Sequence, residues 1–215
     1  MNILFVRLVI LVGAMATLAS CGSAIDMAKR QFGYEDRDIL VTDVKGARNA
    51  EDSAKQQFQT ALQQFQAVTH FNGADLETEY TKLNEQYQNC EARAQTVSNK
   101  ISRVQTAAAD LFSGWEKELG EYSSPELRRS SQEKLNQTKI RYDKVISKMK
   151  DAEKRMTPVL AAFKDRVLFL KHNLNAAAIA SLQTTSAGID TDVAQLIKDM
   201  EASIAEADSF VSQLK

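Results

Sequence analysis

Residues 76–115 read LETEYTKLNEQYQNCEARAQTVSNKISRVQTAAADLFSGW, and this stretch decides the fold. Its apolar side chains recur at alternating spacings of four and three residues, at Leu76, Tyr80, Leu83, Tyr87, Cys90, Ala94, Val97, Ile101, Val104, Ala108, Leu111 and Trp115. A strict period of 3.5 places all of these positions on one side of an α-helix, and such helices supercoil against one another. The stretch therefore predicts one long helix of a coiled-coil-like bundle.

The same spacing recurs in three other parts of the chain. The positions that carry it are Val44, Ala47, Glu51, Ala54, Phe58, Ala61, Phe65 and Val68; Leu135, Thr138, Tyr142, Val145, Met149, Ala152, Met156, Val159 and Phe163; and Ile189, Val193, Leu196, Met200, Ser203, Ala207, Phe210 and Leu214. Turn and capping residues separate these parts, with Asp75 before the second helix, Ser124 and Pro125 before the third, and a loop at 184–188 before the fourth. Pro158 lies inside the third pattern and predicts a kink and not a stop.

These segments predict an all-α fold, an elongated antiparallel coiled-coil-like bundle of three long helices plus a shorter fourth, after an N-terminal signal segment. The first two helices would have about 45 residues each, the third about 58 and the fourth about 27. Each residue adds about 1.5 Å to the length of a helix, so the fourth would be much shorter than the others. We therefore expect four helices at the end that holds the loop at 70–75, and three at the end that holds the loop at 120–125. Residues 159–182 are apolar on several faces, so we expect more than one neighbour to bury them.

The composition agrees with few, long helices. The chain has 215 residues, of which only 8 are glycine and 2 are proline, too few for the many turns of a sandwich, a barrel or a doubly wound α/β fold. Apolar residues make up 44%, which excludes wholesale disorder. The formal net charge of −1 gives no reason to expect a nucleic acid partner.

The first residues have the pattern of an export signal. Arg7 precedes an apolar run from Leu8 to Thr17, which is short for a membrane-spanning helix. The run ends in Leu18-Ala-Ser-Cys21, which resembles the lipobox of bacterial lipoproteins, where the cysteine is lipidated and becomes the new N-terminus. The alternative is an uncleaved anchor helix with a chance cysteine. By resemblance to the usual sorting rule, Gly22 after the cysteine favours the periplasmic face of the outer membrane over the inner membrane.

This signal sets the expected organisation of the chain. We expect a lipoprotein signal peptide at 1–20, a lipidated N-terminus with a tether or frayed helix at 21–38, and a helical bundle domain at 39–215. Cys90 would then have no partner within the chain. Its place in the apolar pattern favours a buried thiol, and a bridge between two chains is the alternative.

The sequence offers no catalytic residue, metal ligand set or cofactor-binding motif. His70 and His172 are not part of an HExxH or ExxH spacing, and a histidine at a helix end or on the surface explains both of them. Neither a GxxxxGK[ST] loop nor a GxSxG elbow occurs. We therefore expect a protein that is not an enzyme. An enzyme hidden in the bundle would need a concave pocket with perturbed titratable groups.

Charge is segregated along the helices. Residues 126–173 hold thirteen basic and six acidic side chains, whereas residues 183–215 hold two basic and six acidic ones. Attraction between adjacent helices explains this pattern, and a basic face for anionic envelope lipid or glycan is the alternative. Our candidate interaction residues are Arg128 and Arg129 at the start of this segment, and Arg166, Lys171, His172 and Asn175 at its end. Simple exposure to solvent is the alternative for the second group.

Three stretches resemble a known family. They are AKQQFQTALQQF at 54–65 running into HFNGAD at 70–75, LRRSS at 127–131, and MTPVLAAFKDRVLFLKHNLNAAAIASLQ at 156–183. Together with the lipobox, they resemble a family of uncharacterised proteobacterial lipoproteins, catalogued only as a domain of unknown function. This resemblance spans about residues 35–215 and brings no activity, cofactor or catalytic residue.

We therefore expect a lipid-anchored lipoprotein of the cell envelope that acts as a non-enzymatic helical interaction or adaptor module in the periplasm. Its partners would be the membrane, through Cys21, and an envelope protein or a second copy of itself. The alternatives are a self-assembling structural scaffold, or a binder of anionic lipid or glycan through the basic helix at 126–173.

Overall fold

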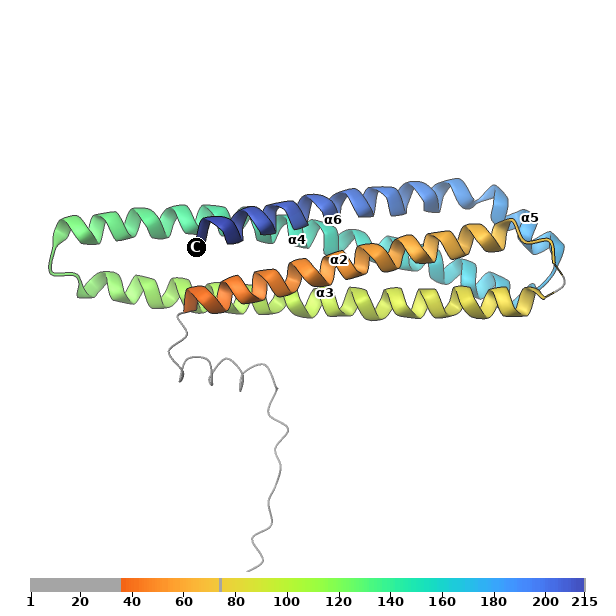
Figure 1. Ribbon diagram of the computed structural model, residues 1–215, viewed down its shortest axis with the longest axis horizontal. Coiled ribbons are helices and arrows are strands. Elements are labelled where there is room, and N and C mark those ends of the chain that lie inside the picture. The colour runs from red at the N-terminus through yellow and green to blue at the C-terminus, as the bar shows by residue number, and fades with distance from the viewer. Residues whose placement is uncertain (1–35, 74, 215) are drawn as a thin grey trace, which may run out of the picture. The chain divides into compact units, whose positions relative to one another are not determined.

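The computed structural model describes residues 36–73 and 75–214. Within them it contains five α-helices, one short 3-10 helix and no strand (Figure 1). The elements in chain order are α2 (Asp36–Thr69), α3 (Leu76–Glu118), η1 (Leu119–Glu121), α4 (Pro125–His172), α5 (Ala176–Thr184) and α6 (Ser186–Leu214). The predicted all-α class is confirmed. The predicted signal segment, the lipidation site Cys21 and the tether at 21–38 lie outside the described residues, apart from the last three residues of the tether.

The four long helices form an antiparallel bundle. α2 packs against α3 and α6, and α4 packs against the same two helices, so each long helix has two long neighbours. Figure 1 shows that α2, α3, α4 and α6 run side by side in alternating directions, with the short α5 at the end where α2 finishes. This arrangement is the up-down-up-down bundle that the sequence predicts.

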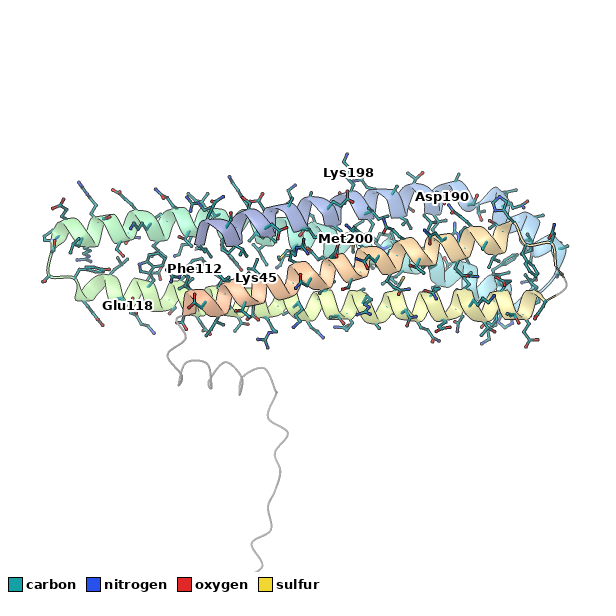
Figure 2. The ribbon with its side chains drawn as sticks, in the orientation of Figure 1. Lys45, Phe112, Glu118, Asp190, Lys198 and Met200 are labelled. Atoms are coloured by element: carbon teal, nitrogen blue, oxygen red, sulfur yellow. The ribbon has the colours of Figure 1, made fainter. Side chains whose placement is uncertain are left out.

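The predicted apolar pattern forms the core. Every one of its positions between Leu76 and Trp115 is buried or half-buried. The largest side chains with almost no exposed surface come from all four long helices, and they include Phe58, Phe65, Leu83, Ile101, Met149, Phe163, Leu196 and Phe210. Met200 of α6 lies among the helices, whereas Lys198 projects away from them (Figure 2). Ion pairs border this core, including one at 3.0 Å between Arg103 and Asp43. A charged group loses less hydration free energy at the edge of a core than at its centre.

The predicted helix starts are confirmed. A side-chain oxygen of Asp75 accepts a hydrogen bond from the Thr78 amide at 3.1 Å, and Ser124 Oγ accepts from the Leu127 amide at 3.3 Å. Pro125 occupies the first turn of α4, where its missing N–H costs nothing. α4 also continues through Pro158 without ending, as predicted.

Two predicted boundaries after Pro158 are wrong. The third helix does not run to about residue 182, because α4 ends at His172 and the nine-residue α5 follows. Asn173 closes α4 by donating from its side-chain amide to the Phe169 carbonyl at 2.9 Å. The loop expected at 184–188 is also absent from the described chain, where only Thr185 separates α5 from α6 and Gly188 is helical.

Among residues 36–73 and 75–214, two long helices reach the end of the bundle that holds the loop at 120–125, where we expected three. The Asp36 carboxylate lies near Gly114, so α2 begins before this end is reached. Within the described residues, the end consists of α3, η1 and α4 alone (Figure 1). Phe112 and Tyr142 pack edge to face there, with ring centroids 5.5 Å apart, and Trp115 Nε1 donates to Ser131 Oγ at 2.8 Å. Phe112 lies between the two helices in Figure 2.

None of the helices in the described part of the chain is both long enough and apolar enough to cross a bilayer.

Candidate interaction site

Three large apolar side chains are exposed where α4 ends and α5 begins. Leu168 is 45% exposed, Phe169 is 38% exposed and Leu174 is 42% exposed. We call these three residues the end patch. The expectation that residues 159–182 are buried on several faces is therefore wrong in part. α3 and α6 pack against α4, whose Phe163, Val167 and Leu170 belong to the core, and the nine-residue α5 is too short to cover the opposite side of α4.

The surface beside the end patch is hollowed on two sides. Asp165, Arg166, Phe169, Ser181, Leu182 and Thr185 line a hollow of about 240 Å³. A second hollow of about 270 Å³ has Leu174 in its wall, together with Phe71, Gly73, Leu76 and Ile179. Apolar side chains next to small hollows are the features that accept an apolar side chain of a partner protein.

Arg166 holds this end of the bundle together. Its Nη1 donates to the Ala162 carbonyl at 2.9 Å, and its Nη2 donates to the Thr185 carbonyl at 3.0 Å. Its guanidinium carbon also lies 5.7 Å from the centroid of the Phe65 ring. Arg166 therefore connects α4 to α2 and to the junction of α5 and α6. This role is structural, and the predicted contact of Arg166 with a partner stays a prediction.

The other predicted residues at this end have different environments. A side-chain oxygen of Asn175 accepts from the Ala178 amide at 3.0 Å, so Asn175 is the N-cap of α5. Lys171 and His172 are exposed, and within the described residues neither side chain forms an ion pair or a hydrogen bond. The exposed side chains of Lys171 and His172 and the exposed apolar side chains of the end patch thus occur together at the end of α4.

The remaining predicted residues lie far from this site. Arg128 and Arg129 are exposed in the first turns of α4, at the opposite end of the bundle. Arg129 Nε lies 3.9 Å from a carboxylate oxygen of Glu133. The structure therefore separates the six predicted interaction residues into two groups and does not form one site from them.

Ion pairs between helices account for little of the positive charge on α4. In the part of the chain that the structure describes, Lys139 pairs with Glu116 of α3 and Arg155 pairs with Asp199 of α6. The basic side chains of α4 without any ion pair among the described residues are Arg128, Arg141, Arg166 and Lys134, Lys144, Lys148, Lys150, Lys154, Lys164 and Lys171. Attraction between adjacent helices is thus an incomplete explanation of the charge segregation.

Sequence reasoning missed a buried acid in the core. Glu51 of α2 is 0% exposed, and Ser203 Oγ of α6 lies 2.9 and 2.8 Å from its two carboxylate oxygens. Burial raises the pKa of Glu51 from 4.5 to about 8, although the hydrogen bond from Ser203 lowers it, and Glu153 adds a small increase by repulsion. The available signal was a charged residue at a core position of the first pattern and a serine at a core position of the last.

The other side chains that could take part in a reaction are not placed for catalysis. Cys90 is buried, as we predicted, its Sγ lies 3.6 Å from the Gln57 carbonyl, and burial raises the pKa of its thiol to about 12. A thiol in this environment is a poor nucleophile. Among the residues that the structure describes, no three His, Cys, Asp or Glu side chains are grouped to hold a metal ion.

Comparison with known proteins gives a family and no activity. No curated protein matches the chain, and no solved structure matches it. A family model described as "Protein of unknown function (DUF2959)" matches residues 27–214, which include all of the described helices. The chain belongs to this family, DUF2959.

Proposed function

We propose that this protein is a lipid-anchored lipoprotein of the cell envelope that acts as a non-enzymatic helical interaction module. Leu18-Ala-Ser-Cys21 supplies the lipidation signal, and Gly22 supports a position on the periplasmic face of the outer membrane. Two or more acyl chains on Cys21 would hold the protein on the bilayer, since each buried methylene contributes about 0.8 kcal/mol. The helical domain would then be available for contact with another envelope protein.

The end patch is the observation that carries this proposal. Leu168, Phe169 and Leu174 come from one short stretch of the chain, and Lys171 and His172 lie between them in the sequence. Apolar side chains grouped on a surface and bordered by polar ones mark sites of protein contact. The partner surface that fits best is apolar at its centre and acidic at its border.

The chemistry of the core supports a role without catalysis. Among the described residues, Glu51 and Cys90 combine strongly raised pKa values with complete burial, and both lie in the packed interior. A catalytic acid or nucleophile has to reach a substrate in a cleft. The hollow beside the end patch instead has Asp165 and Arg166 as its charged wall residues, and Arg166 is already bound to two carbonyl oxygens.

Affinity purification with matched variants tests the proposal. Phe169→Glu with Leu174→Glu adds two negative charges to the end patch, and Gln59→Glu with Gln63→Glu adds two to exposed positions of α2 as the control. We expect one envelope protein to co-purify with the full-length chain and with the control. The amount of this protein recovered should fall at least tenfold with the end-patch variant. Equal recovery with both variants would contradict the proposal. Recovery of the protein itself alone would favour the self-assembling scaffold.

A further inference from the structure

A larger groove lies between α4 and α6, away from the end patch. Its volume is about 470 Å³, and its walls are Lys148, Asp151, Lys154, Arg155 and Pro158 of α4 with Asp199 and Ala202 of α6. The lining residues of α4 lie ten or more positions before Leu168 in the same helix. The groove is therefore separate from the proposed contact site, and its volume is in the range of small-molecule sites in proteins.

One arginine in this groove is held in place for binding. Arg155 Nε donates to Asp199 Oδ2 at 2.7 Å, and Gln195 Nε2 donates to Asp199 Oδ1 at 2.8 Å. Asp199 is thus satisfied by two donors, and it fixes the direction of the guanidinium group. A guanidinium group has five N–H donors, so the contact through Nε leaves its terminal nitrogens for a ligand. A donor that is already oriented loses less entropy when an anion binds.

Two lysines add positive charge without a protein partner. Lys148 and Lys154 line the groove, and neither forms an ion pair in the described part of the chain. Lys148 also lines an adjoining hollow of about 400 Å³, where Lys144 and Ser147 lie with the acidic residues Asp143 and Glu206. The groove therefore has three cationic side chains, Lys148, Lys154 and Arg155, against two carboxylates, Asp151 and Asp199.

The same groove contains hydrogen-bond acceptors. The Asp151 carboxylate lines it and has no ion pair with any residue that the structure describes. Pro158 has no N–H, so the Lys154 carbonyl four residues before it lacks its usual helical donor. A simple inorganic anion would leave these acceptors unused, whereas a ligand that also carries hydroxyl groups would donate to them.

We propose that this groove binds a phosphorylated sugar. The phosphate would contact Lys148, Lys154 and the terminal nitrogens of Arg155, because charge-assisted hydrogen bonds to phosphate are the strongest that these side chains make. The sugar hydroxyls would donate to Asp151 and to the Lys154 carbonyl. This ligand site goes beyond the proposed adaptor role, and its residues are separate from the end patch.

Calorimetric titration of the full-length chain in detergent tests this site. The probes are glucose 1-phosphate, glucose and inorganic phosphate. We expect saturable binding of glucose 1-phosphate that is at least fivefold tighter than binding of inorganic phosphate, and no saturable binding of glucose. Equal affinity for glucose 1-phosphate and inorganic phosphate would overturn the proposal, as would the absence of saturable binding.

Charge-matched variants locate the binding. Lys148→Gln with Lys154→Gln should weaken glucose 1-phosphate binding at least tenfold, whereas Lys45→Gln with Arg93→Gln removes two exposed charges from α2 and α3 and should leave binding unchanged. Asp151→Asn should reduce the preference for glucose 1-phosphate over inorganic phosphate. Circular dichroism of each variant establishes that the helices are retained. Equal losses in both double variants would overturn the assignment to this groove.

The two sources of a sugar phosphate are a free metabolite and the headgroup of a glycolipid. A glucosamine disaccharide bisphosphate without acyl chains represents the second source. Tighter binding of the disaccharide than of glucose 1-phosphate would assign the ligand to a glycolipid headgroup, and tighter binding of glucose 1-phosphate would assign it to a free sugar phosphate. Either order of the two affinities supports the site, provided that Lys148→Gln with Lys154→Gln abolishes the binding.

Discussion

The carboxyl group of Glu51 lies in the core of the bundle, within hydrogen-bond distance of Ser203 of α6. Because burial raises its pKa to about 8, this carboxyl group is mainly protonated at pH 7. In the unfolded chain the same group ionises near pH 4.5. A buried polar pair between two facing helices also favours one register of those helices over others.

We predict that the stability of the protein falls as the pH rises from 4.5 to 8. In this range the native state keeps a proton on Glu51 that the unfolded state has released, so the free energy of unfolding decreases with pH. The loss would reach up to about 5 kcal/mol, at 1.4 kcal/mol per pKa unit. Below pH 4.5 both states hold the proton, and above pH 8 both have lost it, so this contribution to the slope ends at both limits.

Urea unfolding of Glu51→Gln at pH 5 and at pH 8.5 measures this contribution. The amide of glutamine can still bond to Ser203 but does not titrate, so we expect the variant to lose most of the pH dependence and to be more stable than the natural protein at pH 8.5. Asp52→Asn is the control, because Asp52 is half-buried at the border of the core and pairs with Lys55. An unchanged pH slope in Glu51→Gln would show that Glu51 is ionised in the native state.

Arg166 gives a second prediction at this scale. Arg166→Gln removes the cation beside Phe65 and shortens the side chain that reaches the Thr185 carbonyl. We expect a loss of about 1–3 kcal/mol in the free energy of unfolding, from the unmade hydrogen bonds and the lost stacking. Arg128→Gln, at an exposed position, should change stability by less than about 0.5 kcal/mol. Similar urea midpoints for both variants would contradict the structural role of Arg166.

Among the α-helices of the described residues, α5 is the shortest and has the least expected stability as an isolated helix. It has nine residues, and isolated helices of this length are marginal in water. The cap Asn175, the buried side chains of Ile179 and Leu182, and a bond of 2.6 Å from Gln183 Nε2 to the Thr69 carbonyl hold it in place. Arg166 bonds to the Thr185 carbonyl directly after it. The end patch therefore lies on the element boundary that these few interactions define.

We predict that Asn175→Ala loosens α5 before the rest of the bundle. Removal of an N-cap costs about 1 kcal/mol of helix stability. A short helix opens as one unit, so this loss lowers the opening free energy of every amide in it. Hydrogen exchange should become roughly fivefold faster in residues 176–184 and stay unchanged at the centre of α3. Asn136→Ala, at an exposed position inside α4, is the control and should change neither region. Uniform acceleration in all helices would contradict a local role for this cap.

The elements show which parts of the fold are predictable from sequence. The period of 3.5 identifies α3 without the structure, because twelve consecutive positions agree with it, and capping residues identify the starts of α3 and α4. The end of α4 at His172 was not predictable in this way. Asn173 and Asn175 act as a closing residue and a cap only when their side chains turn back onto the backbone, and the same residues also occur inside helices.

The candidate site was predictable only in part. Lys171 and His172 were named from the sequence, but the exposure of Leu168, Phe169 and Leu174 was not, because apolar residues on several faces ordinarily indicate burial. Exposure depends on the short α5, whose length follows from the break at Asn173. The Glu51–Ser203 pair was missed for a related reason, since the facing layer of two distant helices is known only once their register is known.

The whole molecule combines a proposed lipid anchor, a helical bundle and two separate surfaces. We predict that Cys21→Ser releases the protein from the membrane fraction, because the proposed lipid chains would then be absent. Sedimentation of membranes after an alkaline wash, followed by immunodetection, measures the distribution. Cys90→Ser is the control and should remain with the membrane. Retention of Cys21→Ser in the membrane, with the mass of an uncleaved chain, would instead support an N-terminal anchor helix.

Photo-crosslinking in intact cells tests the interaction role most directly. A photo-reactive amino acid replaces Leu168 or Leu174 in the end patch, and in a matched strain it replaces Gln59 on the exposed side of α2. We predict one discrete crosslinked species that contains a second envelope protein from both end-patch positions and none from position 59. Equal crosslinking from position 59, or no crosslinked species from any position at full expression, would contradict the end patch as a docking site.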